Sequence, residues 1–145
     1  MAGRDVLARS QTGSGKTLAF ALPIVEGVRP DEPAPVALVL VPTRELAQQV
    51  ADDFDAVAKA KGLRVGVAYG GTSVRERSRG LARAHVLIAT PGRLTDLADR
   101  GMVKLDRVRI LILDEADRML DMGFQPQVDR IVRKLPEQRQ TMFFS

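Results

Sequence analysis

Short apolar segments alternate with longer helix-like segments along the chain. Several short segments are apolar throughout, as expected for strands covered on both faces of a sheet. The six candidate strands are Asp5 to Ala8, Val36 to Val41, Arg64 to Tyr69, His85 to Ala89, Arg109 to Leu113 and Thr141 to Phe144. The clearest helical patterns are Lys16 to Val28, Arg44 to Lys61 and Pro126 to Leu135. This alternation predicts an α/β fold with a parallel sheet and helices on both faces.

Proline and glycine mark several of the expected boundaries. The apolar residues of Arg44 to Lys61 fall on one stripe, and Gly62 is suited to end that helix. Pro126 suits the first turn of the last helix, whereas Pro23 predicts a bend within the first helix. The segment from Arg29 to Pro35 holds three prolines and two acidic residues. We expect it to be a surface loop within one domain.

Composition excludes several kinds of chemistry. The 145 residues suffice for one domain with a sizeable core, and they include no cysteine and a single histidine, His85. Disulfides, thiolate catalysis and cysteine-based or multi-histidine zinc sites are therefore excluded. The longest apolar run, Val36 to Val41, is too short to span a bilayer, and Met1 to Asp5 lack an apolar signal core. A cytoplasmic location without membrane contact is the expectation. The net charge of +4 permits a polyanionic partner without requiring one.

A glycine-rich segment, Ser10 to Thr17, follows the first candidate strand and opens the first candidate helix. A phosphate-binding loop needs this position, because glycines let backbone N–H groups turn toward phosphates and the helix N-terminus adds positive potential. Lys16 is expected to reach the β- and γ-phosphates, and the Thr17 hydroxyl to ligate Mg²⁺. The general pattern begins with glycine where this chain has Ser10. A merely flexible turn is the alternative, which the Gly-Lys-Thr at a strand-to-helix junction disfavours.

Acidic residues follow the candidate strand that ends at Leu113. A carboxylate at the end of a buried strand can hold Mg²⁺ through water, which is the role expected of Asp114. A second carboxylate can orient and deprotonate an attacking water, which is the role expected of Glu115. Taken alone, the acids from Asp114 to Asp117 could begin a solvated helix. The phosphate loop about 100 residues earlier favours the catalytic interpretation.

Six short motifs occur in the order typical of DEAD-box ATP-dependent RNA helicases. Thr12 to Thr17 resembles motif I, and Asp114-Glu115-Ala116-Asp117 matches the tetrapeptide that names the family. The other four resemble motif Ia, the paired glycines, motif Ib and a Gly-Phe pair; they are Pro42 to Ala47, Gly70-Gly71, Thr90 to Arg93 and Gly123-Phe124. The ordered set is far more specific than any single motif, and it covers nearly the whole chain.

The resemblance implies a three-layer α/β/α RecA-like P-loop NTPase domain over residues 1–145, with ATP and Mg²⁺ as cofactors. It implies the core of an RNA-dependent ATPase that separates short duplexes. The family's upstream Q motif, which recognises adenine, and its second RecA-like domain, which supplies arginines to the γ-phosphate, are expected to lie outside these residues. Ser145 resembles the first residue of motif III.

The resemblance also assigns a role to each candidate site residue. The catalytic residues are Lys16, Asp114 and Glu115, and the metal ligands are Thr17 and Asp114. The nucleotide-binding residues are Thr12, Gly13, Ser14, Gly15, Lys16 and Thr17. RNA-backbone contacts fall to Pro42, Thr43, Arg44, Gly71, Thr90, Gly92 and Arg93. Coupling to the second domain falls to Asp117 and Ser145.

Motifs Ia and Ib have a physical interpretation of their own. Each follows a strand and begins a helix, where free N–H groups can bind phosphate oxygens, and Arg44 and Arg93 add charge. Such contacts would hold a nucleic-acid backbone without reading its bases. The alternative is ordinary helix capping by Thr43 and Thr90, with the arginines on a solvated face.

The family also predicts the order of the strands. In RecA-like folds the motif III strand lies between the phosphate-loop strand and the strand that bears the acids. Thr141 to Phe144 should therefore pair in parallel with Asp5 to Ala8 and with Ile110 to Leu113. That order would bring Lys16 and the acids to one crevice at the carboxyl ends of the strands.

The remaining features are expected to be structural. His85 should be a surface or hydrogen-bonded histidine rather than a catalyst, and Phe54, Phe143 and Phe144 should lie in the core. Aromatic residues make up 4% of the chain, which argues against a base-stacking platform. The basic cluster from Arg75 to Arg83 is expected to be a charged helix face rather than a nucleic-acid patch.

Two other functions remain open at this point. The first is a DNA-directed superfamily 2 helicase or translocase, against which the full Asp-Glu-Ala-Asp and Pro-Thr-Arg-Glu-Leu-Ala motifs argue. The second is a non-catalytic module that binds nucleotide or RNA, because the arginines of the second domain are not among these residues.

Overall fold

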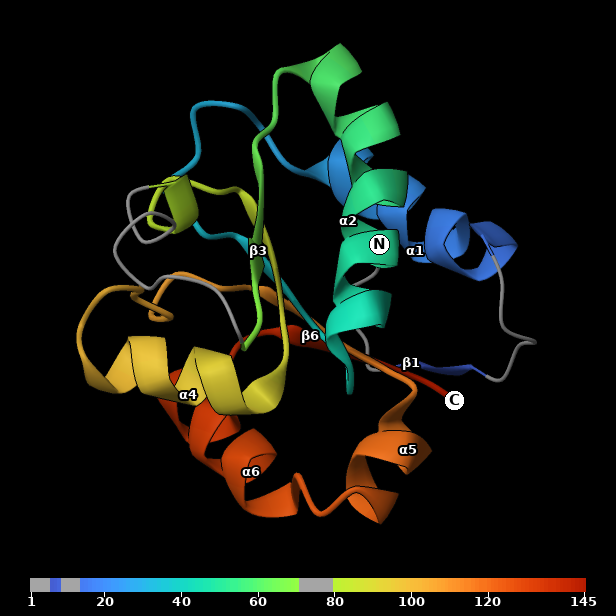
Figure 1. The fold of residues 1–145 in the computed structure, drawn as a ribbon. Coiled ribbons are helices and arrows are strands. Elements are labelled where there is room, and N and C mark those ends of the chain that lie inside the picture. Colours follow the sequence, from blue (N-terminus) through green and yellow to red (C-terminus); the bar gives the residue numbers. More distant parts are fainter. Residues whose placement is uncertain (1–5, 9–13, 71–79) are drawn as a thin grey trace.

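A six-stranded sheet organises the described part of the chain (Figure 1). The computed structural model describes residues 6–8, 14–70 and 80–145. The strands are β1 (Val6–Ala8), β2 (Ala37–Leu40), β3 (Val65–Ala68), β4 (Val86–Ala89), β5 (Ile110–Asp114) and β6 (Gln140–Phe144). Every pairing is parallel, so the prediction of a parallel sheet is confirmed. Each described strand lies within one or two residues of its expected bounds, and Asp5 falls outside the described residues.

The strand order is β1-β6-β5-β2-β4-β3. The last strand, β6, therefore lies between β1 and β5, as the family resemblance predicts. Its register places Phe144 beside both Ala8 and Asp114. The ends of the phosphate-loop strand and of the acid-bearing strand are thus separated only by the end of β6.

Helices connect the strands and cover both faces of the sheet. They are α1 (Ser14–Gly27), α2 (Arg44–Ala58), the 3-10 turn η1 (Lys59–Lys61), α4 (Pro91–Asp99), α5 (Ala116–Asp121) and α6 (Gln125–Lys134). Successive side chains of a strand point to opposite faces, and β2 shows this clearly. Its Ala37 and Val39 belong to one hydrophobic core. Its Leu38 and Leu40 belong to the other.

The two cores define the three layers of the fold. The first packs α1 and α2 against one face of the sheet, through Phe20, Ile24, Val50 and Phe54. The second packs α4 and α6 against the opposite face, through Leu94, Leu97 and Ile131. A strand covered on both sides has no solvent-facing row, which explains why the central strands are apolar throughout. The expected three-layer α/β/α fold is confirmed.

Several boundary predictions can be compared with the structure. Gly62 has a φ of 77° and ends the turn that extends α2, so its role as a stop is confirmed. The first helix runs from Ser14 to Gly27 with Pro23 inside it, and the expected bend there stays a prediction. In the described part of the chain, none of the helices has both the length and the apolar run needed to cross a bilayer.

The residues expected to be structural are buried, except Phe143, which is partly buried. His85 is 1% exposed, and both of its ring nitrogens are engaged. Its Nδ1 accepts from the backbone N–H of Arg64 at 2.9 Å, and its Nε2 lies 2.8 Å from the carbonyl oxygen of Pro30. Phe54 and Phe144 lie in one core, and Phe143 packs against the other. The predicted basic helix face falls largely on residues 71–79, outside the described residues.

Candidate functional site

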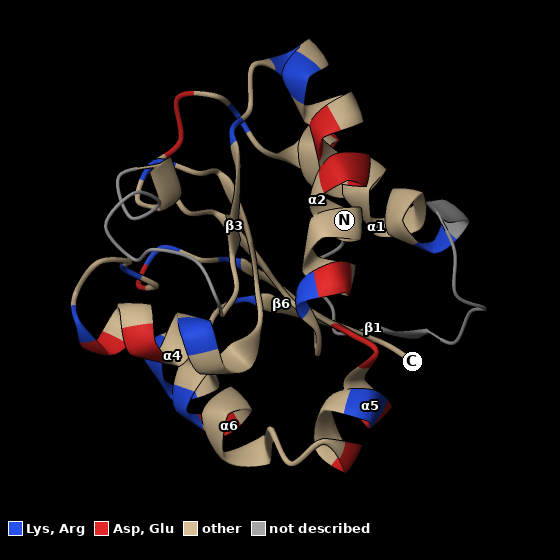
Figure 2. Cartoon of the chain, viewed as in Figure 1, with Lys and Arg blue, Asp and Glu red and all other residues tan. Residues whose placement is uncertain are grey.

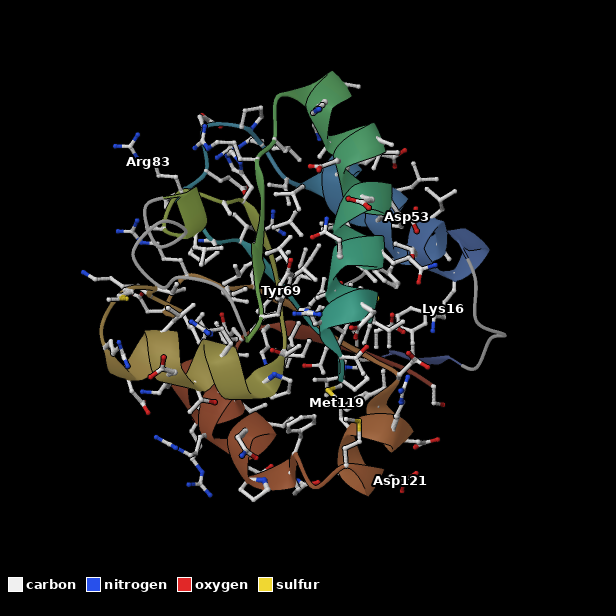
Figure 3. The ribbon with its side chains drawn as sticks, in the orientation of Figure 1. Lys16, Asp53, Tyr69, Arg83, Met119 and Asp121 are labelled. Atoms are coloured by element: carbon white, nitrogen blue, oxygen red, sulfur yellow. The ribbon has the colours of Figure 1, made fainter. Side chains whose placement is uncertain are left out.

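A buried ion pair joins the first helix to the acid-bearing strand. Lys16 lies in the first turn of α1, and Asp114 is the last residue of β5. Lys16 Nζ lies 2.9 Å from Asp114 Oδ1, and the two side chains are 6% and 2% exposed. Figure 3 shows Lys16 at the start of α1, on the side of the molecule that carries α5. Either charge buried alone would be strongly destabilising, so each makes the burial of the other possible.

Carboxylate oxygens at this position lack hydrogen-bond partners. Asp114 Oδ1 and Glu115 Oε2 are buried, and neither has a hydrogen bond within the described part of the chain. The contact of Lys16 with Asp114 is therefore a charge pairing rather than an aligned hydrogen bond. Buried polar atoms are nearly always hydrogen-bonded, and exceptions are typical of sites that take an ion or ligand. Figure 2 shows the acidic turn between β5 and α5.

Glu115 has an unusual backbone. Its φ of 53° and ψ of 50° place it in the left-handed region, and it is the only non-glycine residue with positive φ among those the structure describes. This conformation costs a residue with a β-carbon about 1–2 kcal/mol. Such strain is found mainly at functional sites. It turns the chain sharply from β5 into α5, immediately after Asp114.

The residues expected to hold Mg²⁺ supply the oxygen ligands that this ion prefers. Thr17 follows Lys16 on α1 and is 4% exposed, and the Asp114 carboxylate is 2% exposed. Mg²⁺ is commonly held by one or two protein oxygens, with waters and phosphates completing its shell. No group of three or more acidic, histidine or cysteine side chains able to hold a metal occurs among the described residues. The donor set therefore fits Mg²⁺ delivered with a nucleotide, rather than an ion held in an all-protein cage.

The phosphate loop is only partly within the described residues. Ser14 and Gly15 form the start of α1. Thr12 and Gly13 lie outside the described residues. The helix that follows the loop has no acidic residue in its first turn, so no carboxylate of its own offsets the positive end of its dipole there.

Motifs Ia and Ib emerge at the same edge of the sheet as Asp114. In β2, Leu40 pairs with both Ala89 of β4 and Leu113 of β5. Because the three strands are parallel and in register, the residues that follow them share one edge. The tertiary structure thus brings together three motifs that are far apart in the sequence.

The two threonines at this edge behave differently. Thr43 precedes α2, and its Oγ1 accepts from the backbone N–H of Leu46 at 3.2 Å. Thr90 precedes α4 but makes no such side-chain capping bond. The capping alternative is therefore confirmed for Thr43 and wrong for Thr90. One reason is Pro91, the first residue of α4, which has the backbone angles of a helix start by itself.

The other candidate RNA contacts differ in exposure. The Arg44 side chain is 59% exposed and forms an ion pair with Glu45 at 3.7 Å. Exposed pairs of this kind are weak, so the Arg44 guanidinium remains available to a phosphate. Gly92 is exposed, Arg93 is partly exposed and Pro42 is buried. Gly71 lies outside the described residues.

The family model for DEAD/DEAH box helicases matches residues 1–145. The chain belongs to the DEAD/DEAH box helicase family. It is 46% identical over 144 residues to the DEAD-box ATP-dependent RNA helicase CshA of Streptococcus pneumoniae, and 47% identical over 166 residues to the DEAD-box ATP-dependent RNA helicase 52A of Oryza sativa subsp. japonica. These alignments cover 99% and 100% of this chain but only 28% of each relative.

Solved structures agree with this assignment. A DEAD box protein from the hyperthermophile Methanococcus jannaschii superposes with a TM-score of 0.92 at 39% identity, covering 98% of this chain and 39% of that one. A hypothetical ATP-dependent RNA helicase from Sulfolobus tokodaii gives a TM-score of 0.89 at 37% identity, covering 99% of this chain and 41% of that one. The DEAD-box domain described here is thus similar to a part of each longer protein.

The two residues expected to couple the site to a second domain lie on α5 and just after β6. Asp117 is exposed on α5, and Ser145 directly follows the β6 residue that pairs with Asp114. The expected coupling residues therefore lie on either side of the Asp114–Glu115 turn. Arg118 was not among the expected site residues, yet its Nη1 lies 4.0 Å from Glu115 Oε2. Its spacing of three residues from Glu115 on a short helix is the sequence signal that could have indicated it.

Proposed function

We propose that this chain is the Mg-ATP-binding core of an ATP-dependent RNA helicase. The observation that carries the proposal is the buried Lys16–Asp114 pair, which joins the phosphate-loop helix to the acid-bearing strand at 2.9 Å. The carboxyl edge of a parallel α/β sheet is where such folds bind ligands. The names of the two relatives support the same activity.

Each residue of the site has a separate role in this proposal. Lys16 exchanges the Asp114 carboxylate for the β- and γ-phosphate oxygens of ATP, while Thr17 and Asp114 bind the metal, Asp114 partly through water. Mg²⁺, when bound, neutralises negative charge on the phosphates. Glu115 orients the attacking water and accepts its proton. Glu115 Oε2, which makes no hydrogen bond in the described part of the chain and lies 4.0 Å from Arg118 Nη1, is the atom proposed to accept that proton.

The protein would hold the sugar-phosphate backbone of RNA at the carboxyl edge of the sheet. The starts of α2 and α4 offer N–H groups, and Thr43, Arg44, Thr90, Gly92 and Arg93 add hydroxyl, main-chain and charged donors. Contacts of this kind go to phosphates and sugars and carry no sequence information. Binding should therefore weaken steeply with salt and vary little with base sequence.

Nucleotide binding by the 145-residue chain tests the first part of the proposal. A fluorescent ATP analogue should bind weakly with Mg²⁺, and Lys16→Ala should remove most of that binding. Lys59→Ala is the matched control, because it removes an exposed lysine from η1. ATP and GTP should compete about equally, because the adenine-recognising segment is not among these residues. An affinity unchanged in Lys16→Ala would contradict the proposal.

A comparison of RNA with DNA tests the second part. When a second RecA-like domain is joined to this chain, single-stranded RNA should stimulate phosphate release and DNA of the same sequence should not. Equal stimulation by DNA would favour the DNA-directed helicase instead. An absence of turnover in the joined protein would favour the non-catalytic module.

A further inference from the structure

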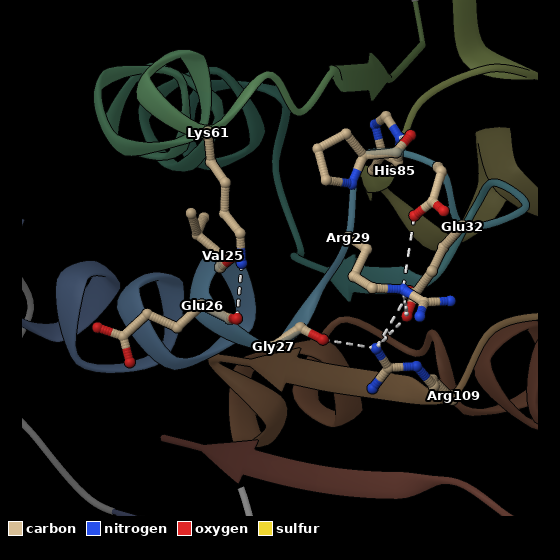
Figure 4. Close-up of polar contacts among 10 residues, drawn as sticks. Val25, Glu26, Gly27, Arg29, Glu32, Lys61, His85 and Arg109 are labelled. Atoms are coloured by element: carbon tan, nitrogen blue, oxygen red, sulfur yellow. Dashed lines mark hydrogen bonds and ion pairs between the residues drawn. The ribbon is translucent and has the colours of Figure 1, made fainter.

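The phosphate-loop helix is tied to the acid-bearing strand at both of its ends. At the carboxyl edge of the sheet, Lys16 near the start of α1 meets Asp114 at the end of β5. At the opposite edge, the residue that precedes β5 reaches the end of the same helix. Arg109 Nη2 donates to the carbonyl oxygen of Gly27, the last residue of α1, at 2.8 Å (Figure 4). The same Nη2 lies 3.1 Å from both carboxylate oxygens of Glu32.

A second cation completes the end of α1. Lys61, in the turn after α2, donates through Nζ to the carbonyl oxygens of Val25 at 2.5 Å and Glu26 at 2.6 Å (Figure 4). Three successive carbonyls of the last turn are therefore occupied by cationic side chains from other elements. The helix has no basic residue of its own in that turn. Cations at this position complement the negative end of the helix dipole and satisfy carbonyls that have no partner within the helix.

The core-facing side of α1 is packed on both sides of Pro23, the proline inside this helix, and can therefore transmit position from one end to the other. Phe20, Ala21 and Ile24, which lie between the two ends, are at most 1% exposed and pack in the core. Close-packed interiors yield little, and an α-helix keeps a fixed rise per residue. A shift of the last turn would therefore move the first turn along the sheet, and with it Lys16.

We propose that Arg109 and Lys61 are positioning residues of the nucleotide site, which act on it through α1. By holding the last turn of the helix, they set how far its first turn reaches past the end of β5. Binding groups need placement to within about 0.5 Å, so a small axial shift of α1 would weaken the grip of Lys16 on phosphate. This inference rests on the proposed function, because it requires that Lys16 bind nucleotide.

The test measures the affinity of the 145-residue chain for a fluorescent ATP analogue in the presence of Mg²⁺. The measurement is made at a temperature well below the unfolding midpoint of every variant, and each affinity is corrected for the folded fraction. Arg109→Met and Lys61→Met should each weaken binding about 2- to 30-fold, the range seen for residues that couple to a site without touching its ligand. Lys61→Arg, which keeps a cation able to reach the same carbonyls, should restore most of the affinity.

Matched controls distinguish an effect on the position of α1 from the loss of a positive charge and from a loss of folding stability. Arg107→Met and Lys59→Met remove exposed cations two residues away, and both should bind like the wild type. A purely structural role would lower the unfolding temperature of Arg109→Met and Lys61→Met while leaving the affinity of the folded protein unchanged, and that result would overturn the inference. If Lys16→Ala weakens binding but Arg109→Met and Lys61→Met do not, the proposed function stands and this inference fails. If Lys16→Ala has no effect, the proposed function fails and this inference fails with it.

Discussion

Glu115 occupies a position that is costly for the fold. Its left-handed backbone opposes folding, and its buried Oε2 has no hydrogen bond in the described part of the chain. It also stands at the N-cap of α5 without making a capping bond. Its ion pair with the half-exposed Arg118, 4.0 Å away, is weak and offsets little of this cost. We propose that chemistry at the site, rather than stability, accounts for a glutamate at this position.

Replacing Glu115 with glycine should stabilise the domain. Glu115→Gly removes the steric cost of positive φ and should raise the free energy of unfolding by about 1 kcal/mol. Urea denaturation followed by circular dichroism measures this value. Glu115→Gln is the control, because it keeps the backbone strain and should stay within about 0.5 kcal/mol of the wild type. A destabilised Glu115→Gly would show that the carboxylate supports the fold.

At the scale of elements, the starts of α2 and α4 are alike in sequence but not in structure. A threonine precedes each helix, but only Thr43 makes a side-chain cap. Sequence reasoning could not separate them, because both are common capping residues. The capping bond identifies Thr43 as a structural threonine, whereas the Thr90 hydroxyl makes no capping bond and is available to a ligand.

Alanine substitutions at Thr43 and Thr90 should differ in their effect on the free energy of unfolding. Thr43→Ala should lower the free energy of unfolding by about 1 kcal/mol, because the Leu46 N–H loses its acceptor. Thr90→Ala should change it by less than about 0.5 kcal/mol. Thr90→Ala should nevertheless weaken RNA binding, measured by fluorescence anisotropy. Equal destabilisation by the two substitutions would contradict this division.

The edge strand β3 packs closely at Gly66 against Leu81 and Ala84, which precede β4. A β-carbon added at Gly66 would lie 2.8 Å from Ala84 Cβ and 2.9 Å from Leu81 Cδ2. Gly66→Ala should therefore destabilise the domain by about 1–3 kcal/mol, as overpacking does in other cores. Thermal unfolding measures the effect. Gly27→Ala is the control, because nothing lies within 4 Å of the added carbon, and its stability should be equal or slightly higher.

At the scale of the whole molecule, the sheet collects the site from strands that are distant in sequence. The order β1-β6-β5-β2-β4 sets the ends of the strands that carry the phosphate loop, the acids and motifs Ia and Ib along one edge. We propose that this edge holds nucleotide phosphates, a metal and an attacking water. The family resemblance implies that positive charge on the γ-phosphate comes from a second domain.

We therefore expect these 145 residues alone to hydrolyse ATP very slowly, with or without RNA. In related phosphate-loop enzymes an arginine in that role is worth about 10³ to 10⁵ in rate. Phosphate release should rise by a comparable factor when a second RecA-like domain is joined to the chain, and Glu115→Gln should abolish the gain. Brisk RNA-stimulated turnover by the 145 residues, removed by Glu115→Gln, would show that the catalytic charge is already present.

Much of this domain follows from the sequence alone. Apolar segments alternating with amphipathic ones predict the layers, because each pattern reports the burial of its own element. The phosphate loop and the Asp-Glu-Ala-Asp motif likewise predict the chemistry, because they place reactive side chains at strand ends. The pattern of the sequence does not delimit the short helix α5, because six residues that follow a left-handed glutamate carry little periodicity.

Only the tertiary structure decided which of many similar side chains act together. Lys59 and Lys61 are two residues apart and chemically identical, yet Lys61 holds the carbonyls of α1. Arg107 and Arg109 differ in the same way. The contact between Lys16 and Asp114 likewise depends on where the helix lies on the sheet. Composition and periodicity indicate which residues of an element are buried. Contacts between residues far apart in the sequence depend on how whole elements pack together, and no local sequence pattern specifies that packing.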